Sequence, residues 1–288
     1  MTPPAPALID APDLAALAGI ARRVAGLNLP PAKYPMMRAR LRKRMVLLGF
    51  SEIGQYRAFL DRREGRDECA HMAVALTTHV SQFFREPHHF DLLRTKVLPD
   101  LLSHARGGGR VRLWSAGCAN GQEAYSIALT ILEMMPDATR YDLRILATDL
   151  AASVIDRARQ GRFALETLAH VPPRLRHQFR TDGKEMVELA HDPRDLIRFE
   201  VQNLHQPWPM QGQFDVIFCR NVLIYFEHSA CERLLSRFAA ALTPDGWLFL
   251  GHAERLSGPA TAQMRHAGQT CYRRLAPSDV RKAGGHRT

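Results

Sequence analysis

A predicted strand, a glycine-containing turn and a predicted helix carry the residues best suited to chemistry in this chain. Residues 111–114, apart from Arg112, are apolar, Gly117 and Gly121 follow, and a helical pattern begins at about Glu123. This unit binds nucleotide-like ligands in α/β folds, although glycines also close loops that bind nothing. A helix N-terminus that cradles pyrophosphate should not carry a carboxylate. The turn therefore favours S-adenosylmethionine, which has a sulfonium, an ammonium group and a ribose diol but no phosphate.

Two further predicted strands end in polar residues. The second strand ends at Asp149, where doubly wound sheets place an acid that accepts hydrogen bonds from ribose hydroxyls. An aspartate that caps the next helix would give the same pattern. A later strand is followed by Arg220 and Asn221, which we expect to face the ligand crevice. Tyr225 would place its hydroxyl near the reacting methyl group, or it is a half-buried aromatic with a solvated tip.

Arg85 follows two aromatic residues and precedes Glu86-Pro87. A guanidinium on an apolar wall suits bidentate binding of a carboxylate, and a surface ion pair is equally compatible with these residues. His88 and His89 raise the question of a metal. Adjacent helical residues point in different directions, and no other ligand cluster is evident, so we predict no metal.

Residues 33–45 predict a basic amphipathic helix. Arg40, Lys43 and Arg44 lie largely opposite its apolar stripe. This arrangement suits an acidic helical partner, although most such charged runs are solvated faces. The apolar stripe comprises Met37, Leu41, Met45 and Leu48.

The overall composition is that of an ordinary globular protein, with 288 residues, 46% hydrophobic and 24% charged. No apolar run is long enough to cross a bilayer, and the N-terminus lacks the pattern of a secretory signal. The five scattered cysteines predict reduced thiols in a cytoplasm. The net charge of +10 implies an acidic partner, which nucleic acid, a membrane face or a protein could supply.

The hydrophobic periodicity changes at Gly107-Gly108-Gly109. Before it, apolar residues at three- and four-residue spacing predict a helical N-terminal domain over 11–106, after a loose terminus at 1–10. After it, short apolar runs alternate with helical patterns, which predicts βαβ units and a mostly parallel sheet. The predicted helices are 12–25, 33–48, 52–64, 68–79, 88–105, 121–135, 151–160 and 228–242, and the strands are 111–116, 143–148, 214–219, 246–251 and an antiparallel edge strand at 269–274.

One segment interrupts this alternation. Alternating apolar and polar residues in 186–190 and 196–204 predict a small antiparallel insertion at about 161–200. The α/β domain as a whole is expected over 107–276, and a flexible tail over 277–288.

Together these residues resemble the chemotaxis receptor glutamate O-methyltransferases of the CheR type. The resemblance spans about residues 10–275 in the family's order. It implies a Rossmann-like class I methyltransferase domain, preceded by an all-α domain and carrying a small antiparallel β insertion. The matching segments are ALTTHVSQFFREPHHF, LWSAGCANGQEAYSIAL, the strand end at Asp149, VQNL, FDVIFCRNVLIYF, LTPDGWLFLGHAE and GQTCYRR.

The resemblance implies methyl transfer from S-adenosylmethionine, leaving S-adenosylhomocysteine, to the γ-carboxylates of receptor glutamates for sensory adaptation. It places Arg85 and Tyr225 at the methyl-transfer point. Ser81 stands where the family often has threonine, and His79 where some members have asparagine. The expected cofactor site comprises His79, Ser81, Arg85, Gly117, Glu123, Asp149, Asn203, Leu204, Arg220 and Asn221.

The expected partner is the receptor's cytoplasmic helical bundle, bound through Arg40, Lys43 and Arg44. Because the connection 180–185 is short, we expect no dependence on a receptor C-terminal peptide tether. We also expect a cytoplasmic monomer that neither binds nucleic acid nor inserts into membranes. The alternatives are a nucleic-acid methyltransferase, although the chain lacks a D/N-P-P-Y/F strand end, and a non-catalytic cofactor-sensing module. An NAD-dependent oxidoreductase would need the absent G-x-G-x-x-G spacing.

Overall fold

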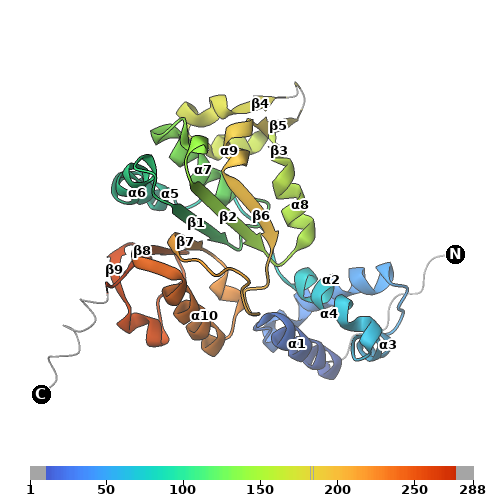
Figure 1. The fold of residues 1–288 in the computed structure, drawn as a ribbon. Helices are drawn as coiled ribbons and strands as arrows, with labels where there is room; N and C mark the ends of the chain where they lie inside the picture. The colour runs from blue at the N-terminus through green and yellow to red at the C-terminus, as the bar shows by residue number, and fades with distance from the viewer. Residues whose placement is uncertain (1–10, 182, 184, 277–288) are drawn as a thin grey trace, which may run out of the picture. The chain divides into compact units, whose positions relative to one another are not determined.

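The computed structural model describes residues 11–276 except 182 and 184 (Figure 1). The predictions for 1–10 and 277–288 concern residues outside this description. The chain forms two compact units. Among the described residues, unit 1 contains 11–78 together with Asn203–Pro207 and Tyr225–Ala230, and unit 2 contains the remainder.

Unit 1 is built mainly from four α-helices, in agreement with the periodicity of its sequence. Met37 and Leu41 of the predicted stripe are fully buried and Met45 nearly so, whereas Leu48, just beyond its helix, is 38% exposed. The helices are α1 (Ala11–Ala25), α2 (Tyr34–Leu47), α3 (Ile53–Leu60) and α4 (Arg66–Leu76), with 3-10 turns at Pro31–Lys33 and Arg63–Gly65.

Unit 2 contains a seven-stranded sheet in the order β6-β2-β1-β7-β8-β10-β9. The first five strands in this order are parallel, and β10 and β9 pair antiparallel at one edge. This arrangement confirms the predicted mostly parallel sheet. The strands are β1 (Val111–Ala116), β2 (Leu143–Asp149), β6 (Ile197–Val201), β7 (Phe214–Cys219), β8 (Leu242–Leu250), β9 (Met264–Gly268) and β10 (Cys271–Arg274).

Helices connect the parallel strands of the sheet, because neighbouring parallel strands need a crossover connection. The central strands β1 and β7 are buried along almost their whole length. Phe218 of β7 and Phe249 of β8 stack with ring centroids 4.3 Å apart, which joins neighbouring strands on one face. The helices are α5 (Pro87–Leu92), a π-helical turn (Leu93–Val97), α6 (Leu98–Arg106), α7 (Gln122–Met134), α8 (Ala152–Gln160) and α10 (His228–Ala241), with 3-10 turns at Ala138–Arg140, Leu223–Tyr225 and Gly258–Ala262. The start of α10, up to Ala230, and Tyr225 of the second turn are assigned to unit 1.

A separate three-stranded antiparallel sheet, in the order β3-β5-β4, confirms the predicted insertion. The prediction that 196–204 belongs to it is wrong, because β6 pairs in parallel with β2 at the edge of the main sheet. Phe199 is buried while Val201 is exposed, so a half-covered edge strand produced the alternation. The insertion contains β3 (Arg162–Ala164), β4 (Phe179–Thr181), β5 (Met186–Leu189), α9 (His191–Asp195) and 3-10 turns at Leu165–His170 and Pro173–Gln178.

The helices α5 and α6 belong to unit 2, whereas the sequence placed them in a helical domain ending at 106. Phe90, Leu93 and Leu102 share one buried cluster with Leu113 of β1. Periodicity shows that a segment is helical but not which surface its apolar side covers, which explains the difference. Among the described helices, none combines the length and apolarity that a membrane span requires.

Candidate functional site

The turn between β1 and α7 has the strand–glycine–helix geometry that the sequence predicts. Gly117 and Gly121 both have φ near +90°, where a side chain is strained. A Cβ on Gly117 would lie 2.4 Å from Val222 Cγ2, and one on Gly121 would lie 2.9 Å from the Ala158 Cβ. Glycine is therefore required twice in this turn, both by the backbone and by close packing.

Asp149 lies at the carboxyl end of β2, beside the end of β1, and is buried. Its Oδ2 accepts a hydrogen bond from Ala119 N at 2.9 Å and its Oδ1 from Ala151 N at 3.0 Å. His79 Nε2 lies 3.3 Å from Oδ1. The carboxylate thus joins the glycine turn to the start of α8. Because each oxygen has more than one acceptor position, capacity remains for ribose hydroxyls.

Glu123, in the first turn of α7, is buried and forms an ion pair with Arg220. Its Oε1 accepts a hydrogen bond from Ser115 Oγ at 2.7 Å, and its Oε2 accepts one from Arg220 Nη1 at 3.2 Å. Burial raises the pKa of Glu123, while Arg220 and Ser115 act in the opposite direction. Both oxygens therefore already have protein donors, which the sequence argument for a ligand contact did not anticipate.

Arg220 is the buried cation that contacts both Glu123 and Glu86, and its side chain is only 2% exposed. Besides Glu123, its guanidinium donates to the Arg85 carbonyl oxygen through Nη2, and this nitrogen lies 3.3 Å from Glu86 Oε2. The end of β7 is thus tied to α7 and to the segment before α5. In the described chain, no ion pair or hydrogen bond involves the Arg85 guanidinium, which leaves it available to a substrate.

Glu86 was not predicted as a site residue, yet it lies in this network. Its Oε1 accepts hydrogen bonds from the backbone N of His252, at 3.3 Å, and lies 3.1 Å from that ring's Nδ1. Burial alone would raise the pKa of Glu86, but Arg220 and His252 outweigh it and lower this pKa to about 2. Glu86 is therefore a permanent anion near neutral pH.

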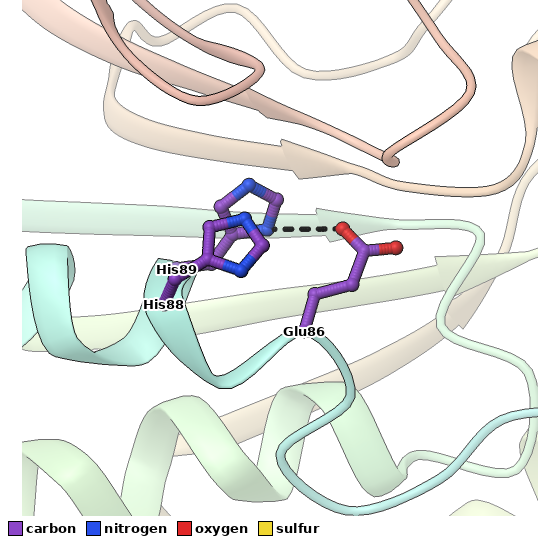
Figure 2. Close-up of side chains that lie close together, drawn as sticks. All are labelled: Glu86, His88 and His89. Atoms are coloured by element: carbon purple, nitrogen blue, oxygen red, sulfur yellow. Dashed lines mark ion pairs between the residues drawn. The ribbon is translucent and has the colours of Figure 1, made fainter.

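Figure 2 shows His88 and His89 beside Glu86, with His89 Nδ1 3.4 Å from Glu86 Oε2. One possible ligand atom from each of the three residues lies within 4.8 Å of the others. The sequence argument that adjacent histidines must diverge is therefore wrong. The prediction that no metal binds now rests on Arg220, because its guanidinium lies against the same carboxylate oxygen and would repel a second cation.

His89 is fully buried, and its Nε2 lies 3.0 Å from both Gln269 O and Thr270 Oγ1. Burial and the nearby Arg220 lower the pKa of His89 to about 4. The imidazole is therefore neutral near pH 7, and its Nε2 contacts both Gln269 O and Thr270 Oγ1. It anchors α5 to the β9–β10 hairpin.

Asn221 follows Arg220 in a left-handed conformation, with φ of +59°. Its backbone N donates to Glu254 Oε2 at 2.9 Å. Ser81 is partly exposed. Their expected contacts with the cofactor stay predictions. Sequence reasoning missed the buried Glu254 and the partly buried Glu86, since neither has a spacing that distinguishes it from a surface glutamate.

Three predicted site residues, Asn203, Leu204 and Tyr225, belong to unit 1. Asn203 Nδ2 donates to Val24 O at 2.8 Å, and its Oδ1 accepts from His205 N at 2.9 Å. The Tyr225 hydroxyl donates to Thr78 O at 3.3 Å and lines a cavity of about 250 Å³. The other lining residues are Leu27, Asn28, Leu29, Ala32, Lys33, Met36, Arg40, Leu76 and Thr78.

The basic residues of α2 have different environments. Arg40 donates to Thr77 O at 2.8 Å and to Thr78 Oγ1 at 2.7 Å. Arg44 forms hydrogen bonds with the buried Glu68. Lys43 is exposed. Arg44 therefore has an internal structural partner, and Lys43 is the more accessible candidate for binding another protein.

Comparisons with known proteins agree with this geometry. Residues 79–273 match the family described as CheR methyltransferase, SAM binding domain, and residues 12–77 match its all-alpha domain. A probable chemotaxis protein methyltransferase of Rhizobium etli is 41% identical over 263 residues, covering 90% of this chain and 98% of the relative. Chemotaxis protein methyltransferase 2 of Pseudomonas aeruginosa is 36% identical, with 87% and 88% covered. The Escherichia coli chemotaxis protein methyltransferase is 34% identical, with 86% and 85% covered.

The close approach of Val222 to the glycine turn predicts unequal effects of two glycine substitutions. Gly117→Ala and Gly108→Ala both place a side chain at positive φ, but nothing lies within 4 Å of a Cβ at Gly108. We expect Gly108→Ala to cost about 1–2 kcal/mol in the free energy of unfolding, and Gly117→Ala at least about 1 kcal/mol more. Urea unfolding measures both, and equal losses would show that Val222 moves away freely.

The ion pair of Glu86 with Arg220 predicts a pH-dependent contribution to stability. The pKa of Glu86 falls from 4.5 to about 2 on folding, so its stabilisation is complete above about pH 5 and is lost as the pH falls toward 2. The difference in unfolding free energy between the wild type and Glu86→Gln should narrow across this range.

Urea unfolding at pH 7, 5.5, 4.5 and 3.5 measures this difference. Glu133→Gln is the control, because Glu133 pairs with an exposed Arg174 and should change stability by less than about 0.5 kcal/mol. A Glu86→Gln difference that stays constant from pH 7 to 3.5 contradicts the expectation.

Proposed function

Because the chain belongs to the CheR methyltransferase family, we propose that it methylates the γ-carboxylates of glutamates in chemoreceptor cytoplasmic helices, giving methyl esters. The enzyme is an S-adenosylmethionine-dependent methyltransferase with a Rossmann-like domain. The main support is the β1–α7 turn, whose two obligatory glycines and adjacent Asp149 lie within the matched SAM-binding domain. Carboxylates at this edge suit a cationic ligand with a ribose diol better than one with phosphates.

We assign Asp149 to the ribose hydroxyls and the backbone of the Gly117 turn to the cofactor's amino-acid part. Glu123 is assigned to holding Arg220, since its Oε2 accepts a hydrogen bond from Arg220 Nη1 at 3.2 Å. Arg220 in turn holds the Arg85 carbonyl. The Arg85 main chain is thereby fixed while its guanidinium stays available to orient the incoming glutamate. His79, Ser81, Asn203, Leu204 and Asn221 remain proposed cofactor contacts.

The reaction requires little acid–base chemistry from the protein. A glutamate side chain is ionised at pH 7, so no strong general base is needed. When bound, S-adenosylmethionine supplies a methyl group on a sulfonium that leaves as a neutral thioether. Arg85 would orient the incoming carboxylate, and the Tyr225 hydroxyl, which donates to Thr78 O in this structure, would redirect that hydrogen bond toward the transferring group. Positioning of this kind supplies roughly 7–11 kcal/mol of the barrier reduction.

The proposed partner surface is α2, with the exposed Lys43 as its main contact to an acidic receptor bundle. Arg40 would add positive charge beside it while keeping its hydrogen bonds to Thr77 and Thr78. Arg44 contributes less directly, because it is bound to Glu68. We propose a cytoplasmic monomer that binds neither nucleic acid nor a receptor peptide tether. The tether proposal concerns the connection 180–185, of which residues 182 and 184 lie outside the described chain. Micromolar binding of such a peptide to the full-length protein would refute it.

Incubation with radiolabelled S-adenosylmethionine and a receptor signalling domain tests the reaction. We expect label on the receptor that is released by mild alkali, since methyl esters hydrolyse and methylated nitrogen does not. Bulk RNA and DNA serve as competing acceptors. Alkali-stable label on the receptor, or label on nucleic acid with strong salt sensitivity, would favour the alternative nucleic-acid or nitrogen methyltransferase.

Substitutions at the methyl-transfer point should reduce turnover more than cofactor affinity. We expect Arg85→Ala to lower kcat by about 100-fold and Tyr225→Phe by about 10-fold, because each removes a hydrogen-bond donor to the reacting groups. Calorimetry with S-adenosylhomocysteine should give a Kd within about threefold of the wild type. Arg94→Ala, at an exposed arginine paired with Asp91, is the control. Normal turnover in Arg85→Ala would remove its proposed role.

A further inference from the structure

We propose that Glu254 is a positioning residue for methyl transfer, which fixes the loop after β7 in the conformation that the cofactor site needs. This inference rests on the proposed function, because it takes Asn221 and the glycine turn to be parts of that site. Glu254 follows the end of β8 and is only 4% exposed. It does not itself need to touch the cofactor.

Four backbone N–H groups converge on this one carboxylate. Oε2 accepts hydrogen bonds from Gly251 N at 2.6 Å and Asn221 N at 2.9 Å. Oε1 accepts them from Val222 N at 2.8 Å and Leu223 N at 2.7 Å. Three donors come from consecutive residues after β7 and one from the end of β8. Glu254 therefore joins the carboxyl ends of two adjacent parallel strands.

An ionised carboxylate is the side chain that these donors require. Hydrogen bonds from backbone N–H groups to a charged oxygen are shorter and stronger than neutral ones. Within the described residues, no arginine or lysine forms an ion pair with Glu254. Burial raises the pKa of Glu254, and the four backbone donors act in the opposite direction by stabilising its charged form. A glutamine would offer one acceptor oxygen and would turn an NH₂ group toward two N–H donors, which are left unsatisfied.

The loop held in this way is both strained and functionally placed. Asn221 has φ of +59°, a conformation that costs a non-glycine residue free energy and needs compensating contacts. Its neighbour Val222 packs against Gly117, as the 2.4 Å approach to a Cβ there shows. Gly251 is itself obligatory, since a Cβ would lie 2.7 Å from Asn221 N. Glu254 thus sets the position of Asn221 relative to the glycine turn.

The test compares Glu254→Gln and Glu254→Asp with the wild type. We expect Glu254→Gln to raise the Kd for S-adenosylhomocysteine about tenfold or more by calorimetry, with a binding stoichiometry still near one per chain. The KM for the receptor domain should change less than this Kd, which distinguishes a displaced loop from general damage. Glu254→Asp keeps both acceptor oxygens on a shorter side chain and should restore part of the affinity.

Asp215→Asn provides the matched control. Asp215 lies at the opposite end of β7, where its carboxylate accepts a hydrogen bond from Arg112 N at 2.8 Å. It should change stability while leaving the Kd for S-adenosylhomocysteine within about threefold of wild type.

Two results would overturn the inference while leaving the proposed function intact. One is an unchanged Kd in Glu254→Gln at normal stoichiometry. The other is a reduced stoichiometry with an unchanged Kd in both Glu254 variants, which indicates only partial unfolding. If the wild-type protein bound no S-adenosylhomocysteine, the proposed function would fail, and this inference would fail with it.

Discussion

The arrangement of unit 2 around the proposed cofactor site depends on the contacts of one buried group, the guanidinium of Arg220. It lies between two carboxylates, Glu123 and Glu86, and also holds the Arg85 carbonyl. A buried charge without partners would cost several kcal/mol, so these contacts must form together. They connect β7, α7 and the segment before α5, which are distant in sequence. The network therefore fixes the end of β7, the start of α7 and the segment before α5 relative to one another.

The parallel sheet supplies the other half of this organisation. Because β2, β1, β7 and β8 run in the same direction, their carboxyl ends lie along one edge. Asp149 is the last residue of β2, and Gly117, Asn221 and Glu254 follow the ends of β1, β7 and β8. The carboxylates of Asp149 and Glu254 accept hydrogen bonds from backbone N–H groups of neighbouring loops. Loop conformation at this edge is thus specified mainly by acid-to-backbone hydrogen bonds.

Sequence patterns predicted the sheet, the glycine turn and the polar strand ends, because hydrophobic periodicity and glycine placement are local properties. They could not show that β6 belongs to the main sheet or that α6 belongs to unit 2, since the surface that an apolar face covers depends on tertiary packing. They also identified Arg220 and Glu123 without showing that the two residues pair. Glu86 and Glu254 were missed because the burial of a single carboxylate depends on segments that arrive from elsewhere in the chain.

Unit 1 is built from three separate segments of the chain, so its helical part cannot be isolated intact by a single cut. Asn203 bonds to Val24 O, Leu27 forms an isolated bridge with Phe226, and Tyr225 bonds to Thr78 O. A fragment cut at residue 78 would retain all four helices but lack these partners from the later chain. Leu27, only 4% exposed in the whole chain, would then lose its backbone partner Phe226. An isolated helical unit should therefore include both later segments, Asn203–Pro207 and Tyr225–Ala230, rather than end where the all-alpha family match ends at residue 77.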